Sequence, residues 1–134
     1  MQIFIIGTPL ETAQCLDKKR LNSQINECTI ILRAINGAKA WSNHPIVSMW
    51  KNDASYLKYY RRVLENYMNG WETYDADVVI PIFITQDFLD QMKRRLYTKD
   101  PIHYAQFAEY GTSDENWYIV DGILRKYVNG KRIN

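Results

Sequence analysis

The clearest helical pattern in the chain is DKKRLNSQINECTIILRAING, residues 17–37. Asp17 is a favourable helix N-cap and Gly37 is a favourable stop, so one helix is predicted between them. Apolar residues recur along it at spacings of four and three, which places them in one stripe that faces the core. The members of the stripe are Leu21, Ile25, Cys28, Leu32 and Ile35. A polar strip lies beside it and carries Arg20, Gln24 and Glu27.

A short helix is predicted before this one. Residues 2–7 are apolar and β-branched, which is typical of a strand or an extended arm. The arm leads to Thr8, Pro9 and Glu11, which have the spacing of a capping box with proline at the first helical position. The short helix therefore begins at Pro9, and we expect it to end near Leu16.

Two more helices are predicted further along. Pro45 opens a long helix with a broad apolar face, which Asn69-Gly70 ends. Residues 78–84 are rich in β-formers, but Pro81 argues against a central strand there. Thr85 caps a fourth helix that residues 99–101 break.

The C-terminal third has weaker patterns. A short helical or turn segment follows through residue 107, residues 111–116 form a loop, and the remaining residues carry no clear pattern. We therefore expect a mainly α protein: a compact single-domain bundle of three to four helices over residues 1–134, with long loops and at most short strands.

Length and composition are those of a globular protein. The chain has 134 residues, 46% hydrophobic and 24% charged, which excludes disordered, collagen-like and coiled-coil classes. The longest apolar run is residues 3–6, and no basic-then-apolar leader opens the chain. We expect a cytoplasmic protein without a signal peptide or membrane contact. Cys15 and Cys28 form neither a CxxC pair nor a His/Cys cluster, so we expect no metal and no cofactor.

The positive charge is clustered although the net charge is only +2. One run is formed by Lys18, Lys19 and Arg20, and another by Lys93, Arg94 and Arg95; Arg61-Arg62, Arg125-Lys126 and Lys131-Arg132 are pairs. If the second and fourth helices pack side by side, the two runs form a wall that binds phosphate groups. The alternative is that they are two solvated helix faces.

Glu27 is the carboxylate best placed for chemistry. It flanks the apolar stripe, so partial burial would raise its pKa and suit it to general acid–base catalysis. The alternative is a surface glutamate paired with Arg20, Arg33 or a loop amide. The roles of His44 and His103 are also open. For each histidine there are three interpretations: it contacts phosphate, it exchanges a proton, or it only completes a turn. No phosphate-binding loop, Ser-His-Asp signature or HExxH motif occurs.

Three segments together resemble one protein family. They are LDKKRLNSQINE at residues 16–27, WSNHPIVSMW at 41–50 and YTKDPIHY at 97–104. In order and spacing they are similar to the pyrimidine-dimer DNA glycosylases of the phage endonuclease V type and their bacterial relatives, over about residues 1–107. The resemblance implies a single, mostly helical domain that cuts the glycosyl bond of a damaged pyrimidine and then the sugar–phosphate backbone.

The resemblance also implies which residues act. The nucleophile is the amine at the chain terminus, and the key acid is a glutamate on the long helix. An α-amine titrates near pH 8, so a good part is neutral at pH 7 and can attack the sugar C1′ to form an imine. The implied catalytic residues are Met1, Gln2 and Glu27. The implied DNA-binding residues are Lys18, Lys19, Arg20, Gln24, Asn26, His44, Lys93, Arg94 and Arg95.

Several positions depart from the family. Gln2 is too large for the usual removal of the initiator methionine, so we expect Met1 to stay and to supply the amine, one residue further out. Arg20 stands where the family has a histidine, and Asn26 stands where it has an arginine. Lys93 matches a basic position of the family's fourth helix only approximately.

Three functions therefore stay open. The first is a monomeric DNA glycosylase with abasic-site lyase activity, acting on damaged or abasic double-stranded DNA. The second is a non-catalytic DNA-binding or nucleotide-binding protein on the same scaffold. The third is a protein-interaction or assembly module that exposes aromatic side chains such as Trp117 and Tyr118.

Overall fold

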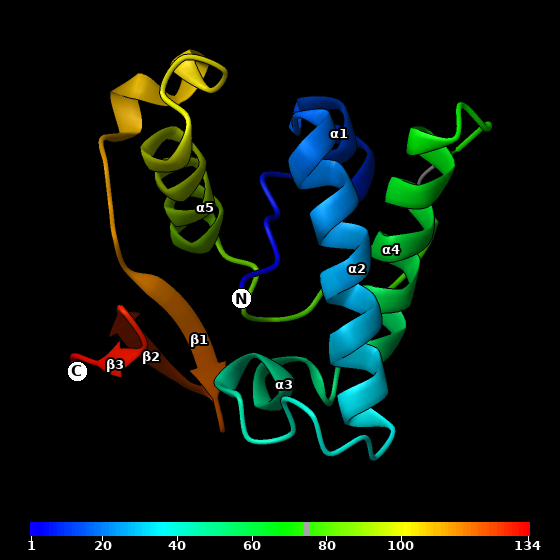
Figure 1. The fold of residues 1–134 in the computed structure, drawn as a ribbon, viewed down its shortest axis with the longest axis vertical. Helices are drawn as coiled ribbons and strands as arrows, with labels where there is room; N and C mark the ends of the chain where they lie inside the picture. The colour runs from blue at the N-terminus through cyan, green and yellow to red at the C-terminus, as the bar shows by residue number, and fades with distance from the viewer. Residues whose placement is uncertain (74–75) are drawn as a thin grey trace.

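The computed structural model describes residues 1–73 and 76–134. Within them the chain forms five α-helices, one 3-10 helix and a three-stranded sheet (Figure 1). The elements are α1 Pro9–Cys15, α2 Lys18–Ile35, α3 Pro45–Trp50, α4 Ala54–Met68, α5 Gln86–Lys99, η1 Ala105–Tyr110, β1 Asn116–Val120, β2 Ile123–Val128 and β3 Lys131–Arg132. The prediction of a mainly α fold with at most short strands is confirmed.

The N-terminal arm and α1 follow the sequence prediction. Residues 2–7 are an extended arm, and its residues 3–5 are buried. The Thr8 hydroxyl accepts from the Glu11 amide over 3.1 Å, and the Glu11 carboxylate accepts from the Thr8 amide over 3.0 Å. This capping box starts α1 with Pro9 in its first turn, and Leu16 is the C-cap.

Helix α2 begins and ends as predicted, but its buried face is rotated. Asp17 caps its first turn, and Gly37 follows its last turn with a φ of 105°. The predicted stripe included Leu32 and Ile35, which are only half-buried; the buried residues are Leu21, Gln24, Ile25, Cys28, Ile31 and Ala34. A seven-residue repeat drifts by about 20° per heptad on a straight helix, and α3 packs against α2. The core-facing side therefore turns toward Ile31 and Ala34.

The predicted third helix is two helices. Helix α3 ends at Trp50 and α4 begins at Ala54, so the single helix expected over residues 45–69 is wrong. Asn52 and Asp53 lie at the break, and both residue types are poor helix formers in a helix interior. The break lets Trp50 stack on Tyr56 with ring centroids 6.3 Å apart, and both side chains are buried.

The C-terminal part adds a sheet that the sequence patterns did not assign. Strands β1, β2 and β3 form an antiparallel meander, in which Val120 pairs with Ile123 across a two-residue turn. The turn residues Asp121 and Gly122 both have positive φ. Residues 78–84 form no strand, in agreement with the objection raised by Pro81.

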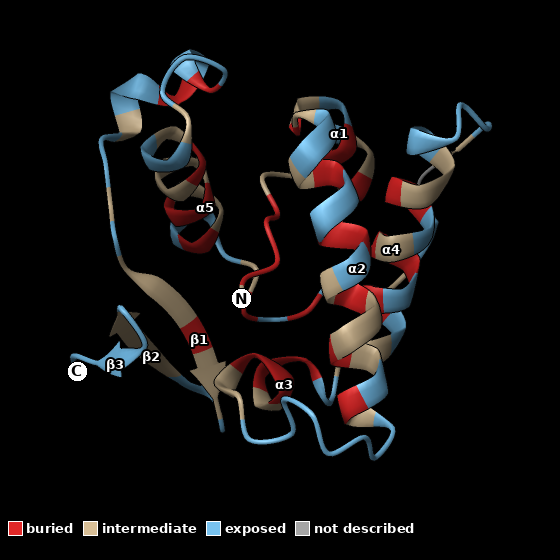
Figure 2. Cartoon of the chain, viewed as in Figure 1, coloured by how far each residue is buried: buried red, intermediate tan, exposed pale blue. Residues whose placement is uncertain are grey.

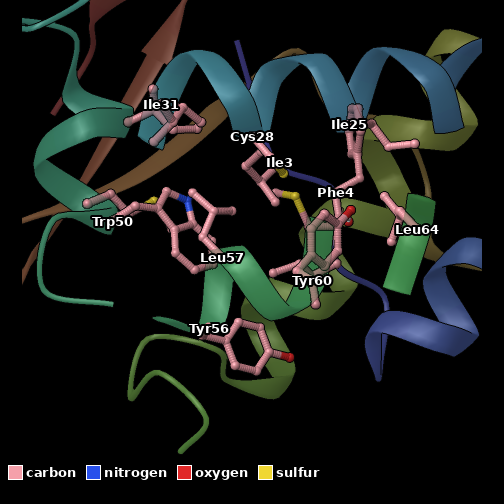
Figure 3. Packing of buried hydrophobic residues seen from close by; sticks show 14 of the residues in the cluster. Ile3, Phe4, Ile25, Cys28, Ile31, Trp50, Tyr56, Leu57, Tyr60 and Leu64 are labelled. Atoms are coloured by element: carbon pink, nitrogen blue, oxygen red, sulfur yellow. Dashed lines mark hydrogen bonds between the residues drawn. The ribbon is translucent and has the colours of Figure 1, made fainter. Parts of the chain in front are cut away.

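The core lies between α2, α4 and the buried N-terminal arm. Figure 2 shows the buried residues lining the inner sides of these elements. Side chains from all three meet in Figure 3, where Phe4 of the arm and Cys28 of α2 lie beside Tyr60 of α4. None of the helices formed by the described residues is long and apolar enough to cross a membrane.

Candidate active site

The amino terminus is held inside the fold. In Figure 1 it lies between α2 and α5, above α3 and beside β1. The carbonyl oxygen of Met1 accepts a hydrogen bond from the Tyr118 hydroxyl of β1 over 2.7 Å. Gln2 is buried, and neither its side-chain oxygen nor its nitrogen has a hydrogen-bond partner among the described residues. The terminus is thus fixed in place beside a buried polar side chain that has no hydrogen-bond partner among the described residues.

Gln24 of α2 clamps the arm to the helix. Its Nε2 donates to the carbonyl of Gln2 over 2.9 Å and to the Glu27 carboxylate over 2.8 Å. Its Oε1 accepts from the Phe4 amide over 2.7 Å and from the Tyr60 hydroxyl over 3.2 Å. We expected Gln24 to contact DNA, but its side chain is 2% exposed and its amide is fully used inside the protein. Its role is therefore to position the arm and Glu27.

Glu27 is half-buried next to the terminus. Burial raises the pKa of its carboxyl, against the opposing charges of the terminal amine and Lys99 and the hydrogen bonds from Gln24 and the Gln2 backbone. Both interpretations of this residue have support, since its carboxylate is partly desolvated and also accepts amide hydrogen bonds. Among the described residues its carboxylate makes no ion pair with Arg20 or Arg33. A carboxyl with a raised pKa beside an amine is suited to act as a general acid and base.

Lys99 of α5 interacts with this carboxylate and also with two further cations, Arg95 of α5 and Arg20 of α2. Burial lowers the pKa of Lys99, and the charges of Arg95 and Arg20 lower it further, while Glu27 raises it. Burial also lowers the pKa of Arg95, which interacts with Tyr118. Helices α2 and α5 therefore bring positive charge to the same region as the terminus and Glu27.

The first basic run is divided between the solvent and the site. Lys18, Lys19 and Asn26 are exposed, which is compatible with the predicted DNA contacts. Arg20 pairs with Asp17 over 3.2 Å and reaches Asp100 over 3.9 Å. Arg20 therefore joins the start of α2 to the end of α5 as well as contributing charge to the site.

The second basic run is less free than predicted. We expected Lys93, Arg94 and Arg95 to bind phosphate groups or to form a solvated helix face, but all three are only partly exposed. Lys93 Nζ lies 4.8 Å from the centre of the Tyr110 ring, and Arg94 Nε donates to the Tyr110 carbonyl over 2.9 Å. Arg95 donates to the Ser113 carbonyl over 2.8 Å. These side chains bind η1 and the following loop to α5, so DNA binding by this run stays a prediction.

His44 completes a helix start and also lies near the terminus. It is the N-cap of α3, and its Nδ1 accepts from the Ile46 amide over 3.1 Å. Burial lowers its pKa, and the terminal amine lowers it further. Its ring meets the Tyr118 ring edge-on, with centroids 5.4 Å apart. His103, by contrast, is exposed and packs on Tyr104.

The comparison with known families supports the resemblance seen in the sequence. A family model described as pyrimidine dimer DNA glycosylase matches residues 1–70. The chain belongs to this family. No curated protein and no solved structure matches it. The match spans the arm, α1 to α4, Glu27 and His44, whereas the resembling segment at 97–104 lies outside it.

Sequence reasoning missed two members of the site in this glycosylase-family chain. Lys99 follows Arg95 by four residues on α5, a spacing that puts both on one helix face. Tyr118 was expected as an exposed aromatic for protein interactions, but it is 3% exposed and contacts Met1 and His44. Nothing in the local sequence pairs Tyr118 with the terminus, because the contact joins the two ends of the chain.

Proposed function

We propose that the protein is a DNA repair glycosylase with abasic-site lyase activity on damaged pyrimidines. The observation that carries the proposal is the juxtaposition of the terminal amine and Glu27, which interact electrostatically. Gln24 supports it by donating both to the Glu27 carboxylate and to the carbonyl of Gln2, the residue next to the amine's own. The family match supports the class of substrate. The substrate is double-stranded DNA that contains a damaged or abasic nucleotide.

The reaction begins at the sugar. The neutral α-amine of Met1 attacks C1′ and forms a carbon–nitrogen bond as the glycosyl bond breaks. The base leaves with the bonding pair and takes up the proton that the attacking nitrogen loses. Glu27 in its protonated form gives a proton to the ring oxygen, so that the sugar opens to an imine. The resulting carboxylate then takes a proton from C2′, a double bond forms between C2′ and C3′, and the 3′ phosphate leaves with the electron pair of the C3′–oxygen bond. Water hydrolyses the imine and restores the amine.

Basic side chains hold the DNA for this reaction. Exposed Lys18 and Lys19 contact the phosphate backbone, and Arg20, Arg95 and Lys99 provide the positive charge near the reacting sugar. The damaged nucleotide must leave the base stack, which costs a few kcal/mol and less at a damaged site.

Borohydride trapping tests the proposal directly. Borohydride reduces an imine to a stable amine, so the wild-type protein should form a covalent adduct with an abasic duplex. Intact mass defines the terminus first, and peptide mapping of the adduct should then locate it at Met1. An adduct at Lys99, or none at all on abasic or dimer-containing DNA, contradicts the mechanism.

Two variants sharpen this test. Glu27→Gln should bind the duplex but lose strand cleavage, whereas Glu109→Gln, a matched change at an exposed position of η1, should cleave like the wild type. Adding one residue before Met1 moves the amine and should abolish trapping while leaving affinity unchanged. Salt-sensitive binding without any bond cleavage by the wild type would instead favour the non-catalytic binder.

A further inference from the structure

A groove between α2 and α4 collects positive charge outside the candidate active site. Its volume is about 430 Å³. The residues that line it are Thr29, Leu32, Arg33, Asn36, Lys58, Arg61, Arg62 and Glu65. Four of these are cations and one is a carboxylate, so the groove holds a larger excess of positive charge than the whole chain, whose net charge is +2.

One arginine of the groove is held by contacts within the protein, and the other three cations are free to bind a ligand. Arg61 Nε donates to the Thr29 hydroxyl over 2.8 Å, and its guanidinium pairs with Glu65 over 3.0 Å. Arg33, Lys58 and Arg62 are exposed, and within the described ranges none has a carboxylate within 4.0 Å. Arg61 therefore braces the two helices, and three cations point at solvent around it.

The groove is separate from the Glu27 site. Asn36 follows Glu27 by nine residues, which places the two about half a turn apart around α2 at 3.6 residues per turn. Glu27 interacts with the amino terminus and with Lys99 of α5, whereas every groove residue belongs to α2, its C-cap or α4. One straight DNA segment bound at Glu27 would not reach the opposite side of α2.

We propose that this groove binds the phosphodiester backbone of a second segment of nucleic acid. Sites for small organic ligands are lined mainly by apolar side chains, whereas Leu32 is the sole apolar residue among the described groove residues. Cations from two helices, spaced along an open groove, suit a chain of phosphates, which needs charge rather than an exact motif. The inference rests on the proposed function for its ligand, because that function makes DNA the natural polyanion.

The test measures how affinity for an undamaged duplex depends on KCl concentration. The groove variant combines Arg33→Gln, Lys58→Gln and Arg62→Gln. The control variant combines Lys51→Gln, Lys131→Gln and Arg132→Gln, which removes the same charge at other exposed positions. The slope of log affinity against log salt should fall by about 0.9 for each phosphate that the variant no longer neutralises, so by roughly 2–3 in the groove variant. An equal or larger fall in the control variant overturns the proposal.

Stoichiometry gives a second readout. With a short duplex in excess at low salt, the wild type should bind two duplexes and the groove variant one. Replacing chloride by inorganic phosphate at equal ionic strength distinguishes a groove that binds free phosphate ions from one that binds the phosphates of a nucleic-acid backbone. If phosphate ion removes the difference between wild type and groove variant, the groove is a small-anion site and the nucleic-acid proposal is wrong.

Trapping on an abasic duplex separates this proposal from the proposed function. The groove variant should trap as well as the wild type, because the groove does not touch the terminus or Glu27. If the wild type forms no adduct, the glycosylase mechanism is contradicted. The salt slope and the stoichiometry still test whether the groove binds nucleic acid.

Discussion

The hydroxyl of Tyr118 donates a hydrogen bond to the carbonyl oxygen of Met1 over 2.7 Å, across 117 residues of sequence. Strand β1 thereby fixes the residue that carries the terminal amine, while Gln24 fixes the next residue from α2. A nucleophile must stand about 3–3.5 Å from the atom that it attacks, so freedom of the arm would reduce the productive fraction. The C-terminal sheet therefore belongs to the candidate site although no strand of it carries the proposed nucleophile or acid.

Tyr118→Phe keeps the buried ring and removes only this hydrogen bond. We expect the single-turnover rate of borohydride trapping to fall roughly ten-fold, because a misplaced nucleophile loses orientation. Duplex affinity should stay within about two-fold, since the hydroxyl is turned toward Met1. Tyr127→Phe is the control, because its ring packs on Tyr118 at 5.5 Å. Equal trapping rates in wild type and Tyr118→Phe would rule out a positioning role.

Gln24→Leu should destabilise the whole fold. The substitution strands the Gln2 carbonyl and the Phe4 amide in the interior, while the Tyr60 hydroxyl keeps its hydrogen bond to the Phe4 carbonyl. Each buried polar group left unpaired costs about 1–3 kcal/mol, so we expect the free energy of unfolding to fall by about 2 kcal/mol or more in urea titrations. Asn26→Leu, on the exposed side of the same helix turn, should change it by less than about 0.5 kcal/mol. Similar decreases in the two variants would contradict the conclusion that Gln24 holds the N-terminal arm to α2.

The raised pKa of Glu27 predicts a signed pH dependence of stability. In the window between the ordinary glutamate value, about 4.3, and the raised folded value, the folded protein holds more protons than the unfolded chain. The contribution of Glu27 is therefore greatest below about pH 4 and is lost as pH rises through that window. Melting temperatures of wild type and Glu27→Gln, measured from pH 4 to 8, should diverge, with the wild type becoming relatively less stable as pH rises. A constant difference across this range would contradict the raised pKa.

Local signals predicted the N-terminal half of the fold well. The capping box at Thr8, the Asp17 cap and the Thr85 cap each involve residues three positions apart, so sequence alone contains both partners. The break at Asn52-Asp53 also has a local signal, because both residue types are poor helix formers in a helix interior. The prediction of one helix there was wrong because the apolar pattern continues across the break to residues such as Tyr56.

The turns of the C-terminal sheet carry a local signal that hydrophobic periodicity does not contain. Asp121-Gly122 and Asn129-Gly130 both have positive φ, and such pairs are typical of tight turns between antiparallel strands.

The chemistry of the site was only partly predictable. Helical spacing placed Glu27 at the edge of the buried face, but the bonds that join Gln24 to the arm and Tyr118 to Met1 are long-range contacts.

Asp17 gives the last prediction, at the junction of α2 with the segment after α5. Burial raises the pKa of its carboxyl, but hydrogen bonds from Tyr104 and Arg20 and the charge of Arg20 outweigh burial and leave the pKa lowered. Its contribution to stability is therefore present above the ordinary aspartate pKa and is lost as pH falls through the lowered value. Tyr104→Phe removes the hydroxyl that donates to this carboxylate and accepts from the Asp17 amide over 3.1 Å.

We expect Tyr104→Phe to lower the free energy of unfolding by about 1.5–3 kcal/mol at pH 7, the usual worth of a hydrogen bond to a charged group. The difference from wild type should shrink below about pH 4, because protonation of Asp17 weakens the bond in the wild type as well. Urea titrations at pH 7, 5 and 3 measure the difference in the free energy of unfolding. Tyr97→Phe on α5 is the control, because it also removes one tyrosine hydroxyl. A deficit of equal size at pH 7 and pH 3 would show that the Tyr104 hydroxyl does not act through the charge of Asp17.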